Sequence, residues 1–197
     1  MAALKQGVAI VTGGGSGMGR GIALRFASLG TRVIVVGRSA GNVEETVALI
    51  RAKGGEAQAC LADVSVEADV IRMVTFTTER YGRLDFAANV AGVAATPKPL
   101  HEMSLAEFED DHAVNSRGVF LGMKYQIPAM LKSAGGSIVN VTSGAALGGF
   151  GEIEHDRVAR TSDVHAPRRR RQGLRQGRCH HRPAGTRQAA AGHDLSV

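Results

Sequence analysis

The chain has 197 residues, of which 44% are hydrophobic and 21% charged, and this length and composition suit one globular domain with a sizeable core. Its formal net charge of +6 belongs almost wholly to residues 151–197, which hold ten arginines and five acidic residues, whereas residues 1–150 hold 14 basic and 13 acidic residues. Two cysteines far apart in the chain exclude a disulfide framework.

The chain carries no segment that is typical of membrane insertion or export. No apolar run approaches the roughly 18 residues of a bilayer span. The first apolar run, residues 8–11, is too short for the core of a signal peptide. We therefore expect a cytoplasmic protein with no membrane partner.

Residues 1–150 alternate strand-like and helix-like segments. A short apolar run at 7–13 ends in glycines, which is typical of a strand covered on both faces of a parallel sheet. In chain order, the segments expected after it are a helix around 22–29, a strand at 31–37, a helix at 42–53, a strand within 54–64, a helix at 66–81 and a strand at 83–92.

A long helix and a fifth strand complete this part of the chain. The helix begins at a capping box, Ser104 to Glu107, and contains Pro128, which we expect to kink or shorten it. The fifth strand is expected at 136–143. Strands that alternate with helices in this way predict an α/β fold with a doubly wound parallel sheet.

The first expected strand runs into the glycine-rich stretch TGGGSGMG, residues 12–19. Glycine allows the backbone to turn tightly and to approach a pyrophosphate, and the N-terminus of the following helix favours negative charge. A tight turn without a ligand is the alternative. The stretch predicts a dinucleotide-binding turn whose candidate cofactor-binding residues are Thr12, Gly13, Ser16, Gly17, Met18 and Gly19.

The end of the second expected strand bears on the choice of cofactor. An acidic residue at position 37 would hold the ribose hydroxyls of NAD, but the chain has Gly37 followed by Arg38. An arginine at this point accommodates a 2′-phosphate, so NADP(H) is favoured and NAD(H) stays possible. The alternative is that Arg38 is a solvated surface side chain.

Five segments fall in the order found in a known family. They are TGGGSGMG at 12–19, ADV at 62–64, NVAG at 89–92, VNSRG at 114–118 and SIVNVTS at 137–143. Over about residues 7–150 the chain resembles the short-chain dehydrogenases/reductases. The resemblance implies a Rossmann-type fold and NAD(P)(H)-dependent hydride transfer between an alcohol and a carbonyl of a small-molecule substrate.

The resemblance also implies further cofactor-binding residues. It places Asp63 and Val64 beside the adenine, and Asn89, Ala91 and Gly92 along the cofactor. The family usually has a second asparagine where this chain has Val90, and we expect this difference to loosen a turn rather than to abolish binding. Family members are commonly dimers or tetramers, so a homo-oligomer is expected where the full family fold is present.

The catalytic chemistry that the resemblance implies needs four side chains. A tyrosine is the general acid/base, a lysine lowers the pKa of that tyrosine, a serine hydrogen-bonds the substrate oxygen, and an asparagine supports a proton relay. Asn115 matches the asparagine and Ser143 matches the serine. The tyrosine and lysine are expected 13 and 17 residues after Ser143, where the chain has Asp156 and Arg160. Neither of these side chains substitutes for the missing pair.

Residues 151–197 show neither strand nor helix periodicity and contain no Phe, Tyr or Trp. Such low burial potential predicts disorder. We therefore expect an NAD(P)-binding Rossmann-like domain at 1–150, incomplete at its C-terminal side, and an arginine-rich tail at 151–197 outside the family pattern. A shift of reading frame after Phe150 would account for this change of composition.

Three hypotheses about function stay open. The first is an oxidoreductase of the family type. The second is a truncated or frameshifted chain that at most binds the dinucleotide. The third and most remote is nonspecific nucleic-acid binding through the arginine-rich tail, which lacks aromatic residues for base stacking. No metal site is predicted, because the adjacent residues of CHH at 179–181 do not easily converge on one ion.

Overall fold

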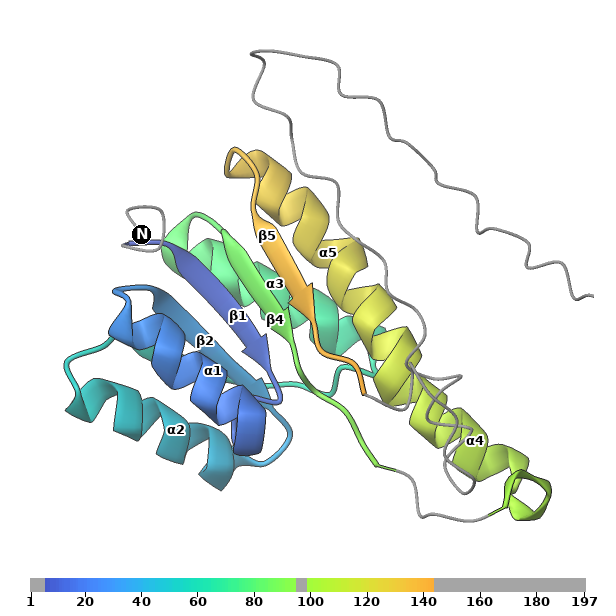
Figure 1. Cartoon of the computed structure of the whole chain (residues 1–197). Helices are drawn as coiled ribbons and strands as arrows, with labels where there is room; N and C mark the ends of the chain where they lie inside the picture. The colour runs from blue at the N-terminus through green and yellow to red at the C-terminus, as the bar shows by residue number, and fades with distance from the viewer. Residues whose placement is uncertain (1–5, 95–98, 144–197) are drawn as a thin grey trace, which may run out of the picture.

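The computed structural model describes residues 6–94 and 99–143 of the chain (Figure 1). The strands are β1 (Val8–Thr12), β2 (Arg32–Gly37), β3 (Ala57–Leu61), β4 (Phe86–Asn89) and β5 (Ser137–Asn140). The helices are α1 (Gly17–Ser28), α2 (Ala40–Ala52), α3 (Glu67–Tyr81), α4 (Leu105–His112) and α5 (Gly118–Lys132), with a short 3-10 turn η2 (Leu100–Glu102) and a π-helical turn η3 (Ala113–Arg117).

All five strands are parallel, and their order in the sheet is β3-β2-β1-β4-β5. The chain therefore builds outward from β1 to β3, returns to the other side of β1, and builds outward again through β4 to β5. In open sheets of this kind, ligands bind outside the carboxyl ends of the strands where the order reverses. That point is the junction of β1 and β4, where Thr12 pairs with Asn89.

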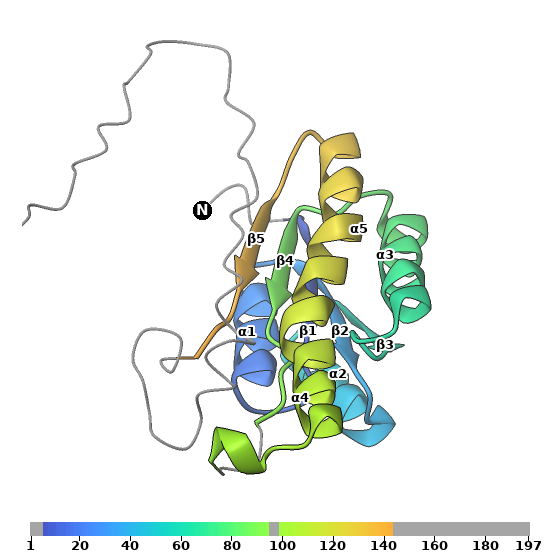
Figure 2. The ribbon, with the colours of Figure 1, turned by 90° about the vertical axis from the view of Figure 1, so that its right-hand side faces the viewer.

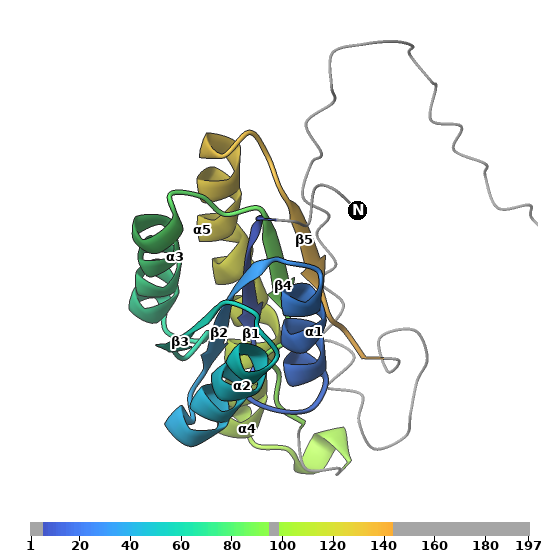
Figure 3. The same cartoon turned by 90° about the vertical axis from the view of Figure 1, so that its left-hand side faces the viewer.

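Helices cover both faces of the sheet: α1 and α2 lie on one face, and α3 and α5 on the other (Figure 2, Figure 3). Successive residues of a strand point to opposite faces. Ile10 of β1 accordingly packs with α3 and α5, whereas Val11 packs with α1 and α2. Because both faces are buried, the central strands are continuous apolar runs, as the sequence predicts.

The predicted capping box is confirmed, since the Ser104 side chain accepts a hydrogen bond from the Glu107 backbone and the Glu107 side chain accepts one from the Ser104 backbone. Of the two expected effects of Pro128, a kink or an earlier end of the helix, the earlier end is not found. α5 continues through Pro128 to Lys132, and the irregularity lies earlier, at the π-helical turn 113–117 that separates α4 from α5. Cys60 is buried in the core, as its place in a strand predicts.

None of the helices within the two described ranges is both long and apolar enough to cross a bilayer. The predicted arginine-rich tail at 151–197, with its suggested nucleic-acid contacts and change of reading frame, lies outside the described residues. The same is true of Asp156 and Arg160.

Candidate functional site

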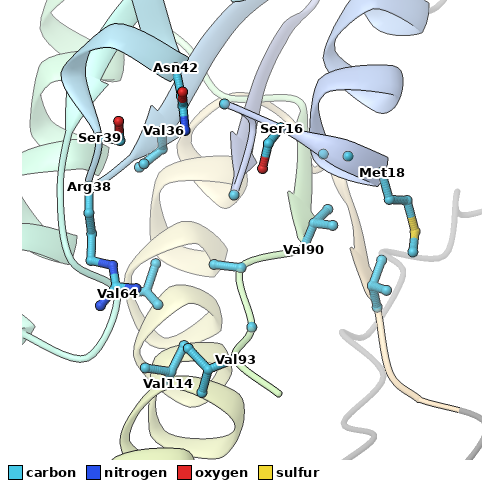
Figure 4. A pocket seen from close by; sticks show the side chains of 18 of the residues that line it. Ser16, Met18, Val36, Arg38, Ser39, Asn42, Val64, Val90, Val93 and Val114 are labelled. Carbon is cyan, nitrogen blue, oxygen red and sulfur yellow. The ribbon is translucent and has the colours of Figure 1, made fainter. Parts of the chain in front are cut away.

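A cleft of about 810 Å³ lies at the carboxyl ends of the strands, where the strand order reverses. Figure 4 shows Arg38, Ser39 and Asn42 at one end of this cleft and Met18 at the other. Most of the predicted cofactor-binding residues line it. They are Gly13, Ser16, Gly17, Met18, Gly19, Arg38, Asp63, Val64, Ala91 and Gly92.

The glycine turn after β1 has a geometry that larger residues would destroy. Gly13 has a φ of +65°, and a Cβ atom there would lie 2.9 Å from the backbone nitrogen of Ala91. A Cβ atom on Gly19 would lie 2.1 Å from the carbonyl oxygen of Gly13. The turn thus packs backbone against backbone, and it leads directly into α1. The N-terminus of α1 adjoins the cleft and favours a bound anion.

Two predicted cofactor-binding residues, Thr12 and Asn89, lie behind the cleft wall rather than in it. The buried Thr12 hydroxyl accepts hydrogen bonds from the backbone N–H groups of Val90 (3.0 Å) and Ala91 (3.2 Å). Thr12 therefore holds the β4 loop against the end of β1. Val90, which stands where the resemblance implies an asparagine, makes this contact through its backbone.

Asn89 belongs to a buried amide network that links β4, β5 and α5. Its side chain exchanges two hydrogen bonds with Gln126 (2.9 and 3.2 Å) and donates a third to the side-chain oxygen of Asn140 (2.9 Å). Gln126 is fully buried. The network fixes the carboxyl end of β5, which leads to Ser143 three residues later.

At the end of the cleft formed by the β2–α2 turn, Arg38 faces Asp63. Arg38 Nη1 lies 3.8 Å from Asp63 Oδ2, and 65% of the Arg38 side chain is exposed. An ion pair this exposed contributes little stability, so the guanidinium group is available to bind an anion that carries more charge than a carboxylate. The Asp63 carboxylate also accepts hydrogen bonds from the backbone and hydroxyl of Ser65, which fix its position.

The backbone of Asp63 is held by a second carboxylate. Asp69 accepts a hydrogen bond from the Asp63 N–H group (2.8 Å) and another from Arg72 (2.8 Å). These contacts, the backbone bond first, lower the pKa of Asp69 below its usual value. Asp69 therefore positions the loop after β3 while it remains ionised at neutral pH.

Asn115 and Ser143, the predicted catalytic residues, approach the same end of the sheet from different elements. Ser143 lines the cleft together with Val141 and Thr142. Asn115 lies in the π-helical turn, is buried, and uses both ends of its carboxamide on the backbone N–H and carbonyl of Val93, at 3.0 Å each. The Asn115 side chain thus holds the loop after β4, whose residue Val93 lines the cleft.

No tyrosine or lysine is found among the described residues that line the cleft. Tyr81 is the last residue of α3. Tyr125 lies in α5, and its hydroxyl donates to the exposed carboxylate of Glu67, which also binds Lys124. Neither tyrosine is therefore placed to act on a group bound in the cleft.

Several lining residues were not predicted from the sequence. Ser39 and Asn42 follow Arg38 around the N-terminus of α2, and their nearness to Arg38 in the sequence could have suggested them. Val93 and Val114 come from separate segments, and nothing in their side chains indicates a site. Within the described ranges, no group of three or more His, Cys, Asp or Glu side chains could hold a metal ion.

Comparison with known proteins gives relatives over most of the described region. Levodione reductase of Leifsonia aquatica is 38% identical over 146 residues, which are 73% of this chain and 55% of the relative. The chain thus spans only about half the length of the curated relatives that it matches.

Solved structures agree with the sequence relatives. A short chain dehydrogenase/reductase from Burkholderia phymatum in complex with NAD superposes with a TM-score of 0.79 at 31% identity, covering 82% of this chain and 58% of that one. A metagenomic short-chain oxidoreductase in complex with NADP gives 0.77 at 32% identity, covering 80% and 72%. The model of the short chain dehydrogenase family matches residues 7–154, and the chain therefore belongs to this family.

Proposed function

We propose that the cleft binds a nicotinamide dinucleotide and that the protein is an oxidoreductase acting on a small-molecule alcohol or carbonyl. The main support is the backbone-on-backbone packing of the glycine turn at the β1–β4 junction, where Gly13 and Gly19 leave no room for side chains. Such a turn lets a pyrophosphate approach main-chain N–H groups and a helix N-terminus. When bound, the nicotinamide supplies or accepts the hydride.

We favour NADP(H) as the cofactor, with NAD(H) as the alternative. Arg38 lies at the end of β2 beside Ser39 and Asn42, and its guanidinium group has only a long, exposed contact with Asp63. A 2′-phosphate offers it a doubly charged partner and bidentate hydrogen bonds, which are stronger than that contact. The related structures bind either dinucleotide, so the local chemistry of Arg38 carries this preference.

The substrate would lie beyond the nicotinamide, near Ser143. A serine hydroxyl at this position is suited to hydrogen-bond the substrate oxygen, and Asn115 would act by holding the loop at Val93. Levodione reductase and a γ-butyrolactone 1′-reductase of Streptomyces virginiae, by their names, act on carbonyl compounds. A small carbonyl compound or the corresponding alcohol is therefore the proposed substrate class.

One observation favours a second candidate function, dinucleotide binding without turnover. The positions 13 and 17 residues after Ser143 hold Asp156 and Arg160 instead of a tyrosine and a lysine. An ionised carboxylate has no proton to donate to an alkoxide, and arginine stays protonated. In this second candidate function the cofactor site is intact and only the hydride-transfer step is lost.

Titration of the purified 197-residue chain with NADPH and NADH, followed by nucleotide fluorescence, tests the cofactor proposal. We expect NADPH to bind more tightly, and Arg38→Ala to weaken NADPH about tenfold while changing NADH less than about twofold. Arg25→Ala is the matched control, because Arg25 is exposed on α1 and bonds only Ser28 among the described contacts. Failure of both nucleotides to bind at millimolar concentration would refute the proposal. NADPH oxidation with a panel of ketones then separates the oxidoreductase from the chain that only binds.

A further inference from the structure

Arg20 joins two walls of the cleft without lining it. It is the fourth residue of α1, directly after Gly19, and 25% of its side chain is exposed. Its Nη2 and Nε atoms both donate to the carbonyl oxygen of Gly15, at 2.6 and 3.1 Å. The guanidinium group therefore holds the glycine turn by its main chain.

The same guanidinium group is anchored on α2. Nε donates to the hydroxyl of the fully buried Thr46 (3.0 Å), and Nη2 donates to Glu45 (2.6 Å). Thr46 is itself tied to the carbonyl oxygen of Asn42 (3.1 Å). Arg20 thus connects the glycine turn to the first turns of α2 through one guanidinium group.

The two segments that Arg20 connects carry opposite parts of the adenosine end of the cleft. Gly15 lines the cleft from the glycine turn, and Arg38, Ser39 and Asn42 line it from the β2–α2 turn. They lie close together, because a Cβ atom added at Gly15 would come within 3.0 Å of the Asn42 Cβ atom. The gap between them therefore depends on how the turn is held against α2.

We infer that Arg20 is a positioning residue that sets the spacing between the glycine turn and the Arg38 turn, and so the affinity for the adenosine 2′-phosphate half of the dinucleotide. The inference rests on the proposed cofactor function. A guanidinium group is needed, because its planar fork reaches the Gly15 carbonyl and both α2 partners at once, whereas a lysine ammonium is a single flexible point charge.

A residue that only stabilised the fold would act differently. Its loss would lower the free energy of unfolding but leave the affinity of the folded molecules unchanged. A positioning role predicts weaker binding by protein that is fully folded under the conditions of the titration. Binding and unfolding must therefore be measured on the same samples.

The experiment compares Arg20→Ala, Arg20→Lys and the control Arg25→Ala in the full chain. Dissociation constants for NADPH and for adenosine 2′,5′-bisphosphate are measured at a temperature where circular dichroism shows each variant folded. We expect both Arg20 variants to bind both ligands about tenfold more weakly, since the four hydrogen bonds of the Arg20 guanidinium group are lost or rearranged. The control should stay within about twofold of the wild type.

The outcomes separate the inference from the function on which it rests. If the wild type binds NADPH and either folded Arg20 variant binds it equally well, the positioning role is refuted and the cofactor site stands. If the wild type binds neither ligand, the proposed function fails and the inference fails with it. Should Arg20→Ala not fold, Arg20→Lys decides by the same criterion.

Discussion

Replacement of Gly19 by alanine tests whether the glycine turn is as tightly packed as described. The added Cβ atom would lie 2.1 Å from the Gly13 carbonyl oxygen, whereas ordinary contacts begin at 3.4 Å, so the backbone must open by more than 1 Å. Overpacking costs about 1–3 kcal/mol, and a clash between main-chain atoms belongs at the upper end. Because alanine is favoured over glycine in a helix by about 1 kcal/mol, the expected net loss is about 2 kcal/mol.

The matched control is Gly21→Ala in the same helix. Gly21 is exposed, and a Cβ atom there meets nothing within 4 Å, so this variant should gain up to about 1 kcal/mol. Urea unfolding followed by circular dichroism measures both values, and an NADPH titration should show weakened binding for Gly19→Ala alone. Equal stability of the two variants would refute the packing argument.

Three further changes test other parts of the structure. Gln126→Ala should cost about 2–4 kcal/mol in urea unfolding, because it leaves a cavity and removes the partner of the buried Asn89 amide; a loss below about 1 kcal/mol would contradict this. The pKa of Asp69 is lowered in the folded state, so its contribution to stability is present above its unfolded pKa and is lost as the pH falls through the folded pKa. The free energy of unfolding should therefore fall less steeply between about pH 5 and 3 in Asp69→Asn than in the wild type. Equal slopes of unfolding free energy against pH in the two proteins would contradict this role of Asp69. In a Cys179→Ser background, Cys60 should react with a disulfide reagent only after urea is added, because burial protects the thiol and raises its pKa; rapid reaction of the native protein would disprove this.

The fold of the described region could be predicted because its local signals agree. Each central strand is a short apolar run between glycines, and each helix has its own cap or apolar face. Each of these signals lies within a few consecutive residues, so it can be recognised without knowledge of the tertiary structure. Pro128 shows the limit, because α5 continues past this proline to Lys132, while the sequence gives no sign of the π-helical turn around Asn115.

Much of the lining of the cleft could be predicted, because several of its residue types stand at positions where they have a chemical meaning of their own. The chemical roles of the turn glycines and of Arg38 can be recognised from the amino-acid sequence alone. Thr12 illustrates what the sequence hides, because its place in the motif predicts a cofactor contact while its hydroxyl is used on Val90 and Ala91. Arg20 is hidden for a related reason, since its partners on α2 are more than 20 residues away.

The return of the chain to β1 has a consequence for how the site forms. One wall comes from residues 13–64 and the other from residues 90–143, so neither half of the chain forms the whole cleft by itself. The pocket exists only once β4 has been inserted next to β1. Nucleotide affinity is therefore also an assay of tertiary assembly, and amide hydrogen exchange should slow in both halves together when the pocket is filled.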